Sequence, residues 1–274
     1  GDWSSDVCSS DLDFEYGKMR LYPDPDSSVL VDAIAKRYNV KSSQVFAGVG
    51  SDDVLAIAFM TFFGSEKPVI FPNITYSFYD VWADVYRIPY KQIPLNSDFT
   101  INREDYITEN GGIVIANPNA PTGVMETIEN IEYIVKNNPD SVVIIDEAYV
   151  DFGGESCLPL VEKYENLLVV QTYSKSRSMA GMRIGFAIGS EKLIKYMNDV
   201  KFSINSYTMN PITQLCGAAS MADEEYFRET VDKIIATRER SKARLTELGF
   251  VSPDSKTNFI FASPQKVSAQ VIFE

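Results

Sequence analysis

The sequence predicts an α/β fold in which helices flank a mostly parallel central sheet, followed by a partial small α+β domain. Three short apolar runs, at residues 113–116, 142–145 and 167–170, have the pattern of buried parallel strands. A segment with helical apolar spacing, residues 128–136, lies between the first two runs, and the link from 146 to 167 is long enough for another crossover. Alternating strands and helices are typical of such a sheet.

An earlier segment, residues 44–53, runs from an expected strand through glycines into an apolar helix at 54–60. The free amides at the start of that helix would attract a phosphate. A dinucleotide-binding fold would use the same glycines, but Asp53 follows Gly48 and Gly50 where the fingerprint of that fold has its third glycine. The Walker pattern is absent as well, so neither nucleotide fold is favoured.

Polar residues follow each of the three central runs, namely Asn117, Asp146 and Lys175. Ligands of open α/β sheets bind outside the carboxyl ends of the strands, so these side chains are expected on one rim. The Lys175 amine can condense with an aldehyde, and Arg183, eight residues later, offers a planar fork of donors to a phosphate. Together they suggest pyridoxal phosphate, although a Ser-Lys pair is more commonly a solvated loop.

Asp146 and Tyr149 fit the other half of that chemistry. A carboxylate that faces a pyridine nitrogen keeps the nitrogen protonated, and the ring then withdraws electrons from the substrate. Tyr149 offers a hydrogen bond to the phenolic oxygen of the cofactor. Taken alone, Asp146 is at least as well explained as a helix N-cap.

Composition narrows the function classes. The 274 residues are 45% hydrophobic, enough for one large domain and part of a second, and no apolar stretch is long enough for a membrane span. There is no histidine, which excludes a Ser-His-Asp triad and histidine-bound metals, and three cysteines form no metal-ligand spacing. A net charge of −13 argues against nucleic-acid binding. We expect a cytoplasmic enzyme without a metal.

The ordered motifs resemble the fold-type I pyridoxal-phosphate enzymes, and within them the histidinol-phosphate aminotransferase family. The resemblance runs from about Met19 to the end of the chain. Its most specific parts are residues 20–25, 50–52, 117–123, 146–149, 174–175 and 180–183.

The resemblance implies roles for individual residues. Lys175 would form the imine and later move the proton, with Asp146 on the pyridine nitrogen and Tyr149 on the phenolic oxygen. Tyr76 would stack on the cofactor ring, and Tyr22 would reach the phosphate of a neighbouring subunit, which requires a homodimer; both tyrosines are otherwise ordinary packing residues. The residues implied around the phosphate are Gly50, Ser51, Asp52, Ser174 and Arg183.

Three departures from the family pattern stand out. Ala120 occupies the position of the asparagine that usually contacts the phenolic oxygen, so we assign that role to Asn119 in preference to Asn117. The family's N-terminal substrate arm and its C-terminal carboxylate-binding arginine have no match in this chain. Residues 224–248 and 258–262 have helix and strand signals of a small domain that is C-terminally incomplete.

These features give a domain plan. Residues 3–12 resemble a translated sequencing adapter, so residues 1–12 are taken as a non-native tail. An N-terminal arm follows at 13–30, a large cofactor-binding domain at 31–215, and the incomplete small domain at 216–274.

The implied activity is transamination in two half-reactions between an amino donor and a 2-oxo acid acceptor. In the family, histidinol phosphate and 2-oxoglutarate give imidazole acetol phosphate and glutamate, a step of histidine biosynthesis. Alternatives are a threonine-phosphate-type decarboxylase and an aromatic amino-acid aminotransferase, because cofactor residues report reaction class better than substrate. The non-enzyme alternative is a cofactor-binding but catalytically incompetent fragment.

Overall fold

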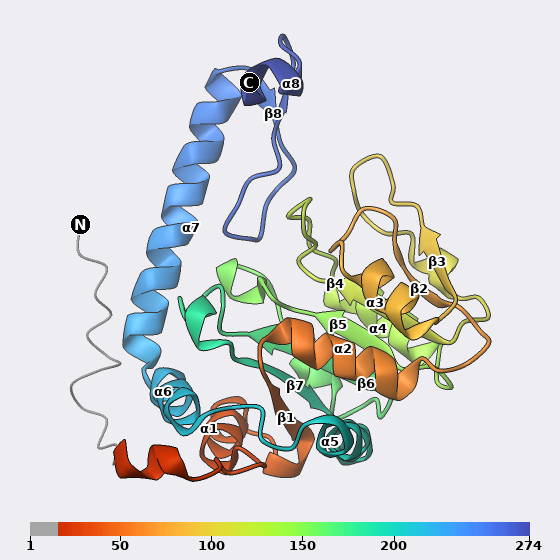
Figure 1. Cartoon of the computed structure of the whole chain (residues 1–274). Helices are drawn as coiled ribbons and strands as arrows, with labels where there is room; N and C mark the ends of the chain where they lie inside the picture. The colour runs from red at the N-terminus through yellow and green to blue at the C-terminus, as the bar shows by residue number, and fades with distance from the viewer. Residues whose placement is uncertain (1–15) are drawn as a thin grey trace.

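The computed structural model describes residues 16–274 and is organised around a seven-stranded sheet (Figure 1). The order across the sheet is β1-β7-β6-β5-β4-β2-β3. Only β7 runs against its neighbours, while the other pairs are parallel. The predicted α/β class with a mostly parallel sheet is therefore confirmed. The strands are β1 (Val45–Gly48), β2 (Val69–Pro72), β3 (Tyr90–Ile93), β4 (Gly112–Ala116), β5 (Val143–Asp146), β6 (Leu167–Thr172) and β7 (Gly185–Gly189).

The three central strands end near one another, β6 two residues beyond β4 and β5. In the register of the sheet, Ala116 of β4 lies opposite Asp146 of β5, and Asp146 lies opposite Val170 of β6. Every residue of these strands is buried, as their unbroken apolar runs predict. The polar residues that follow the strands are consequently brought to one rim of the sheet.

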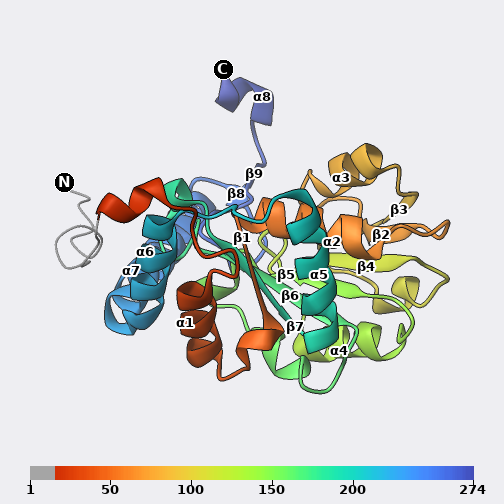
Figure 2. The same ribbon diagram turned by 60° about the horizontal axis from the view of Figure 1, so that its bottom comes forward.

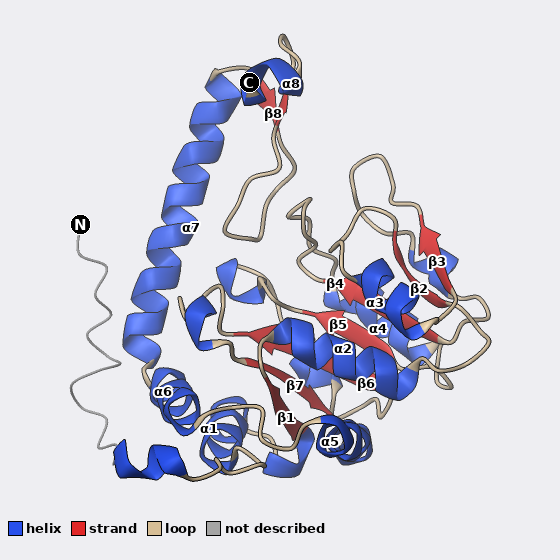
Figure 3. Ribbon diagram, viewed as in Figure 1, coloured by secondary structure: helices blue, strands red, loops and turns tan. Residues whose placement is uncertain are grey.

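Helices cover both faces of the sheet (Figure 3). Alternate strand residues enter two separate apolar layers, so that Ile113 and Ile115 pack on one face and Val114 packs on the other. The first layer contains α1 (Ser28–Tyr38), α4 (Ile128–Lys136) and α6 (Pro211–Ala222), and the second contains α2 (Ser51–Phe62), α3 (Tyr79–Tyr86) and α5 (Glu191–Ile204).

The link between β5 and β6 does not contain the crossover helix for which the sequence has room. It holds two 3-10 turns, Val150–Phe152 and Leu158–Leu160. The buried Glu147 carboxylate accepts a hydrogen bond from the Ser156 hydroxyl at 2.6 Å, which folds the link back onto the end of β5. Gly153, at φ 103°, ends the first turn in a left-handed conformation that favours glycine.

A long helix leaves this body. In Figures 1 and 2, α7 (Glu224–Glu247) extends along one side of the molecule before the chain turns back toward the sheet. Its buried residues are Val231 and Arg238. The remaining elements are a two-stranded pair, β8 (Phe250–Val251) with β9 (Ser263–Pro264), and α8 (Ala269–Phe273). None of the helices within 16–274 combines the length and hydrophobicity needed to cross a bilayer.

The strand expected at 258–262 is absent from the described chain, where that segment is irregular. The Ser255 and Thr257 hydroxyls both donate to the Phe259 carbonyl, at 2.7 and 3.1 Å. Local bonds of this kind compete with a strand ladder for the backbone.

The predicted domain plan is only partly open to comparison. The tail at 1–12 lies outside the described residues, as does the start of the arm at 13–30. The boundary between 215 and 216 stays a prediction. That position falls inside α6, whose Cys216 and Met221 belong to the same apolar layer as α1.

Candidate active site

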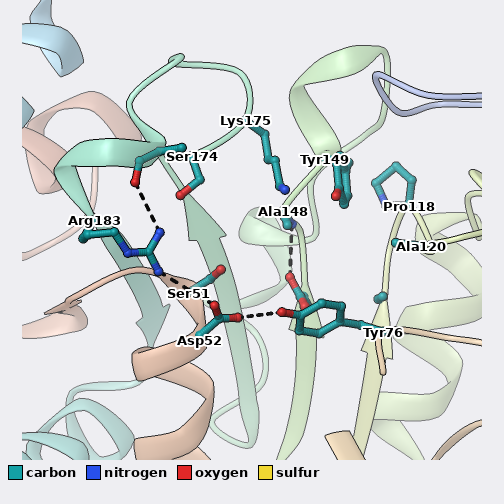
Figure 4. A pocket seen from close by; sticks show the side chains of 13 residues that line it. Ser51, Asp52, Tyr76, Pro118, Ala120, Ala148, Tyr149, Ser174, Lys175 and Arg183 are labelled. Carbon is teal, nitrogen blue, oxygen red and sulfur yellow. Dashed lines mark hydrogen bonds and ion pairs between the residues drawn. The ribbon is translucent and has the colours of Figure 1, made fainter. Parts of the chain in front are cut away.

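A cavity opens where β4, β5 and β6 end and α2 begins (Figure 4). It encloses about 690 Å³ including its open mouth. The three predicted catalytic residues line it, together with most of the predicted cofactor-binding residues. The lining consists of Ser51, Asp52, Tyr76, Ala116, Pro118, Ala120, Asp146, Ala148, Tyr149, Ser174, Lys175, Ala180 and Arg183.

Asp146, the last residue of β5, is the buried carboxylate of the cavity. Its Oδ2 accepts a hydrogen bond from the Tyr79 hydroxyl at 2.8 Å, and its Oδ1 accepts one from the Ala148 amide at 3.1 Å. Burial raises the pKa of Asp146 to about 6, while the two hydrogen bonds and the charge of Lys175 act in the opposite direction. The group is therefore an ionised, well-oriented acceptor near neutral pH.

Lys175 follows the end of β6 and points into the cavity beside Tyr149 (Figure 4). Its Nζ lies 5.2 Å from the centre of the Tyr149 ring. The Phe259 ring packs nearly perpendicular to the Tyr149 ring, with 5.1 Å between the ring centres. The amine thus lies within cation–π distance of the Tyr149 ring.

The opposite end of the cavity is built to hold an anion. Helix α2 begins at Ser51, its first amides have no acceptor within the helix, and Ser51 and Asp52 of its first turn line the cavity. Gly50 precedes them at φ 91°, and a Cβ at this position would lie 2.6 Å from Nη2 of Arg183. Only glycine lets the guanidinium approach the helix start this closely. Ser174 adds a hydroxyl to the same lining.

The Asp52 side chain contacts protein groups at this end. Its Oδ1 accepts a hydrogen bond from the Tyr76 hydroxyl at 2.8 Å, and its Oδ2 lies 3.8 Å from Nη2 of Arg183 (Figure 4). Burial and the bond to Asp52 raise the pKa of Tyr76. The backbone amide of Asp52, at the start of α2, remains the group that suits an anion.

The structure does not bring every predicted residue to the cavity. Both amide hydrogens of Asn119 are engaged, with the Ile74 carbonyl and the Thr122 hydroxyl, and Ala120 lines the cavity instead. The geometry therefore does not favour Asn119 as a donor to a cofactor. Tyr22 is 81% exposed and stacks on Tyr207 at 4.6 Å, and it is not part of the cavity lining.

Two residues of the site are not among those expected from the sequence. Tyr79 is fully buried and bonds Asp146, and Phe259 packs on Tyr149. The available hint for Tyr79 was its closeness in sequence to Tyr76, which lies three residues before the helix that Tyr79 begins. Phe259 gave no comparable hint.

These groups fit pyridoxal phosphate. An amine, a buried carboxylate and an anion-binding helix start with Arg183 occur in one cavity, and the Gly50 position leaves the guanidinium room to stay there. Lys175, Asp146 and Arg183 would hold the aldehyde, ring-nitrogen and phosphate ends respectively. Across residues 16–274 no cluster of three or more histidine, cysteine or acidic side chains is arranged to hold a metal ion.

Comparison with known proteins relates this chain to a family of aminotransferases. The family model of the class I and II aminotransferases matches residues 10–271. The histidinol-phosphate aminotransferase of Lactococcus lactis subsp. cremoris strain MG1363 is 53% identical over 262 residues, which cover 96% of this chain and 74% of that protein.

Solved structures agree in fold. The histidinol-phosphate aminotransferase of Clostridium acetobutylicum has a TM-score of 0.86 at 21% identity and covers 94% of this chain and 78% of that one. The Sinorhizobium meliloti histidinol-phosphate aminotransferase in complex with pyridoxal-5'-phosphate has a TM-score of 0.83 at 23% identity. The match covers 92% of this chain and 70% of that one. Because the family model spans nearly the whole sequence and a relative shares half of its residues, the chain belongs to the class I and II aminotransferases.

Proposed function

We propose that this chain catalyses pyridoxal-phosphate-dependent transamination with histidinol phosphate as amino donor and 2-oxoglutarate as acceptor, a step of histidine biosynthesis. The observation that carries the proposal is the meeting of Lys175, Asp146 and Arg183 in one cavity at the strand ends. The choice of substrates rests on the 53% identical relative, which is named histidinol-phosphate aminotransferase.

Lys175 performs the proton transfer. When bound, the cofactor supplies an aldehyde carbon that condenses with amines and a ring that withdraws electrons from the substrate. The Nζ atom of Lys175 would hold the aldehyde end of the cofactor, and as a free amine it would accept the proton from the substrate carbon that bears the amino group. The chain contains no histidine that could take this role.

Asp146 and Tyr149 tune the ring. The Asp146 carboxylate holds a negative charge in a buried position, where it keeps a facing ring nitrogen protonated. Tyr149 offers its hydroxyl to the phenolic oxygen. With the Asn119 amide engaged elsewhere, Tyr149 is the donor that the cavity provides for this contact.

The phosphate would be bound by Arg183, by the hydroxyls of Ser51 and Ser174, and by the first amides of α2. These groups act locally, because the whole chain carries a net charge of −13 that repels a phosphate at long range.

We also propose that Tyr22 completes the cavity of a second copy of the chain, so that the working unit is a homodimer. Its 81% exposure and its place outside its own cavity support this assignment. The compartment we propose is the cytoplasm, since Cys157 is a buried free thiol, as suits a reducing environment.

The test of the reaction is a Lys175→Ala substitution. Loss of the proton-transferring amine should lower the rate of amino exchange between histidinol phosphate and 2-oxoglutarate about 10²- to 10⁴-fold. A Lys192→Ala variant, which removes an exposed lysine of α5, should keep the rate. Full activity in Lys175→Ala would overturn the proposal.

The substrate is tested separately. Purified protein with pyridoxal phosphate should show the visible absorption band of bound cofactor, and histidinol phosphate should convert it faster than glutamate or an aromatic amino acid does. Carbon dioxide release from threonine phosphate would identify a decarboxylase instead. A bound cofactor that none of these donors changes would identify a catalytically incompetent chain.

A further inference from the structure

Two tyrosines, Tyr79 at the start of α3 and Tyr76 three residues before it, each donate a hydrogen bond to one carboxylate of the cavity. Tyr76 donates to Asp52 at 2.8 Å, and Tyr79 donates to Asp146, also at 2.8 Å. The first pair lies at the phosphate end, and the second pair lies beneath the position expected for the ring nitrogen. The start of α3 and the loop before it therefore support both acidic groups of the site.

Tyr79 cannot turn away from Asp146. Its side chain is fully buried, and its ring is packed by Phe59, Phe71 and Trp82 at ring-centre distances of 6.4, 5.8 and 6.3 Å. The hydroxyl is thus held at the carboxylate by the apolar layer beneath the sheet. This is the arrangement of a side chain that fixes another in place.

We propose that Tyr79 is a positioning residue that fixes the Asp146 carboxylate and keeps it ionised, so that Asp146 can pair with a protonated ring nitrogen. The proposal rests on the proposed function for the identity of that ring. Tyr79 itself does not line the cavity, and it acts through Asp146.

The electrostatic balance around Asp146 makes this hydrogen bond important. Burial favours the neutral acid, and the Asp52 charge from α2 acts in the same direction. The Tyr79 hydroxyl, the Ala148 amide and the Lys175 charge favour the ionised form of Asp146. Tyr149 is a further phenol that lines the cavity. Without the Tyr79 hydroxyl, the Ala148 amide is the remaining hydrogen bond to the carboxylate.

The variant that tests the proposal is Tyr79→Phe, which removes one oxygen and keeps the packed ring. Tyr106→Phe is the matched control, because the Tyr106 hydroxyl is equally buried and has no hydrogen-bond partner. The Asp146 titration can be followed in the full chain without cofactor, as the infrared carboxyl band that disappears in Asp146→Asn. We expect Tyr79→Phe to raise the pKa of Asp146 by about one unit, and Tyr106→Phe to leave it unchanged.

Cofactor binding gives a second readout. With Asp146 titrating near 7 instead of 6, Tyr79→Phe should weaken pyridoxal phosphate binding about fivefold at pH 6 and less than twofold at pH 8. Loss of affinity that is equal at every pH would indicate a purely structural role and overturn the proposal, as would an unmoved infrared titration. Failure of the wild-type chain to bind cofactor would refute the proposed function, while the infrared titration would still decide the role of Tyr79.

Discussion

At the scale of single residues, the consecutive acids Asp146 and Glu147 serve different purposes. Asp146 lines the cavity, whereas Glu147 is 1% exposed and lies behind it. The Glu147 carboxylate accepts hydrogen bonds from Ser156 at 2.6 Å and from Gln171 at 2.8 Å. Gln171 in turn accepts one from the Tyr38 hydroxyl of α1 at 2.7 Å. Glu147 thus ties the link after β5 to β6 and α1.

Glu147 gives a pH dependence of stability that can be measured. Burial raises its pKa from 4.5 to about 7, so in this window the folded chain keeps a proton that the unfolded chain has lost. The stability that protonated Glu147 contributes is fully present below pH 4.5. It is lost as pH rises to 7, so the free energy of unfolding falls by about 3 kcal/mol over this range. When the free energy of unfolding is measured with urea on the cofactor-free chain, Glu147→Gln should not show this decrease with pH.

The matched control is Glu155→Gln, which removes an exposed acid of the same link. Its stability should follow the wild-type pH dependence. The pKa of Asp146 is also raised, to about 6, so Asp146 lowers the free energy of unfolding as pH rises. This effect is the same in the wild type, Glu147→Gln and Glu155→Gln, and therefore cancels when the three are compared. Parallel curves for the wild type and Glu147→Gln would show that Glu147 is ionised throughout this range.

At the scale of elements, local patterns predict the centre of the sheet well. The apolar runs at 113–116, 142–145 and 167–170 fall on β4, β5 and β6, and the segment at 128–136 coincides with α4. These elements bury continuous apolar faces, so their periodicity is strong. Lys175 follows directly from them, since the rim position depends only on where the strands end.

Other elements depend on contacts that no local pattern reports. The exposed residues of β3 and the reversed direction of β7 are set by neighbours across the sheet. Tyr79 meets Asp146 across 67 positions of sequence, and Phe259 reaches Tyr149 only after the turn beyond α7. The parts of the site that sequence reasoning missed are those assembled by topology.

Arg238 fastens α7 to this site. The residue is 6% exposed, and Nη1 of its guanidinium donates to the carbonyls of Phe152 and Thr257 at 2.7 and 2.8 Å. Phe152 follows Tyr149 closely in sequence, and Thr257 precedes Phe259 by two residues. One side chain therefore joins the two segments whose rings meet beside Lys175.

We expect Arg238→Met to destabilise the chain by about 3 kcal/mol, because two buried carbonyls lose their donor. The returning segment at 253–262 should also become more sensitive to limited proteolysis. Arg240→Met, which changes an exposed arginine of the same helix, is the control. Equal stability and equal proteolysis of the two variants would show that Arg238 does not hold the segment.

At the scale of the whole molecule, the arm before α1 carries apolar side chains on its surface. Met19, Leu21 and Tyr22 are 50%, 54% and 81% exposed. The chain behind them is anchored, because the buried Lys201 amine donates to the Pro25 carbonyl at 3.0 Å and the Gln214 amide donates to that of Asp24 at 3.1 Å. An anchored arm with exposed apolar residues is a surface that a second copy of the chain can cover.

The last prediction follows from the proposed role of Tyr22 in that second copy. Because Tyr22 is exposed, Tyr22→Ala should change the free energy of unfolding of one chain by less than about 0.5 kcal/mol. Cofactor affinity should nevertheless fall about tenfold, as expected for a lost hydrogen bond to a charged phosphate. Tyr226→Ala, at an exposed tyrosine of α7, should change neither quantity.

Mixing two impaired variants at limiting cofactor separates a partner role from a role within one chain. In a dimer of one Tyr22→Ala subunit and one Lys175→Ala subunit, the first supplies Lys175 and receives the intact Tyr22 of the second. Random pairing at limiting cofactor should then restore about a quarter of the wild-type sites. If Tyr22 served its own chain, each mixed dimer would lack one of the two residues in both sites, and mixing would restore nothing. Recovery of activity in the mixture is therefore the result that only a shared active site can produce.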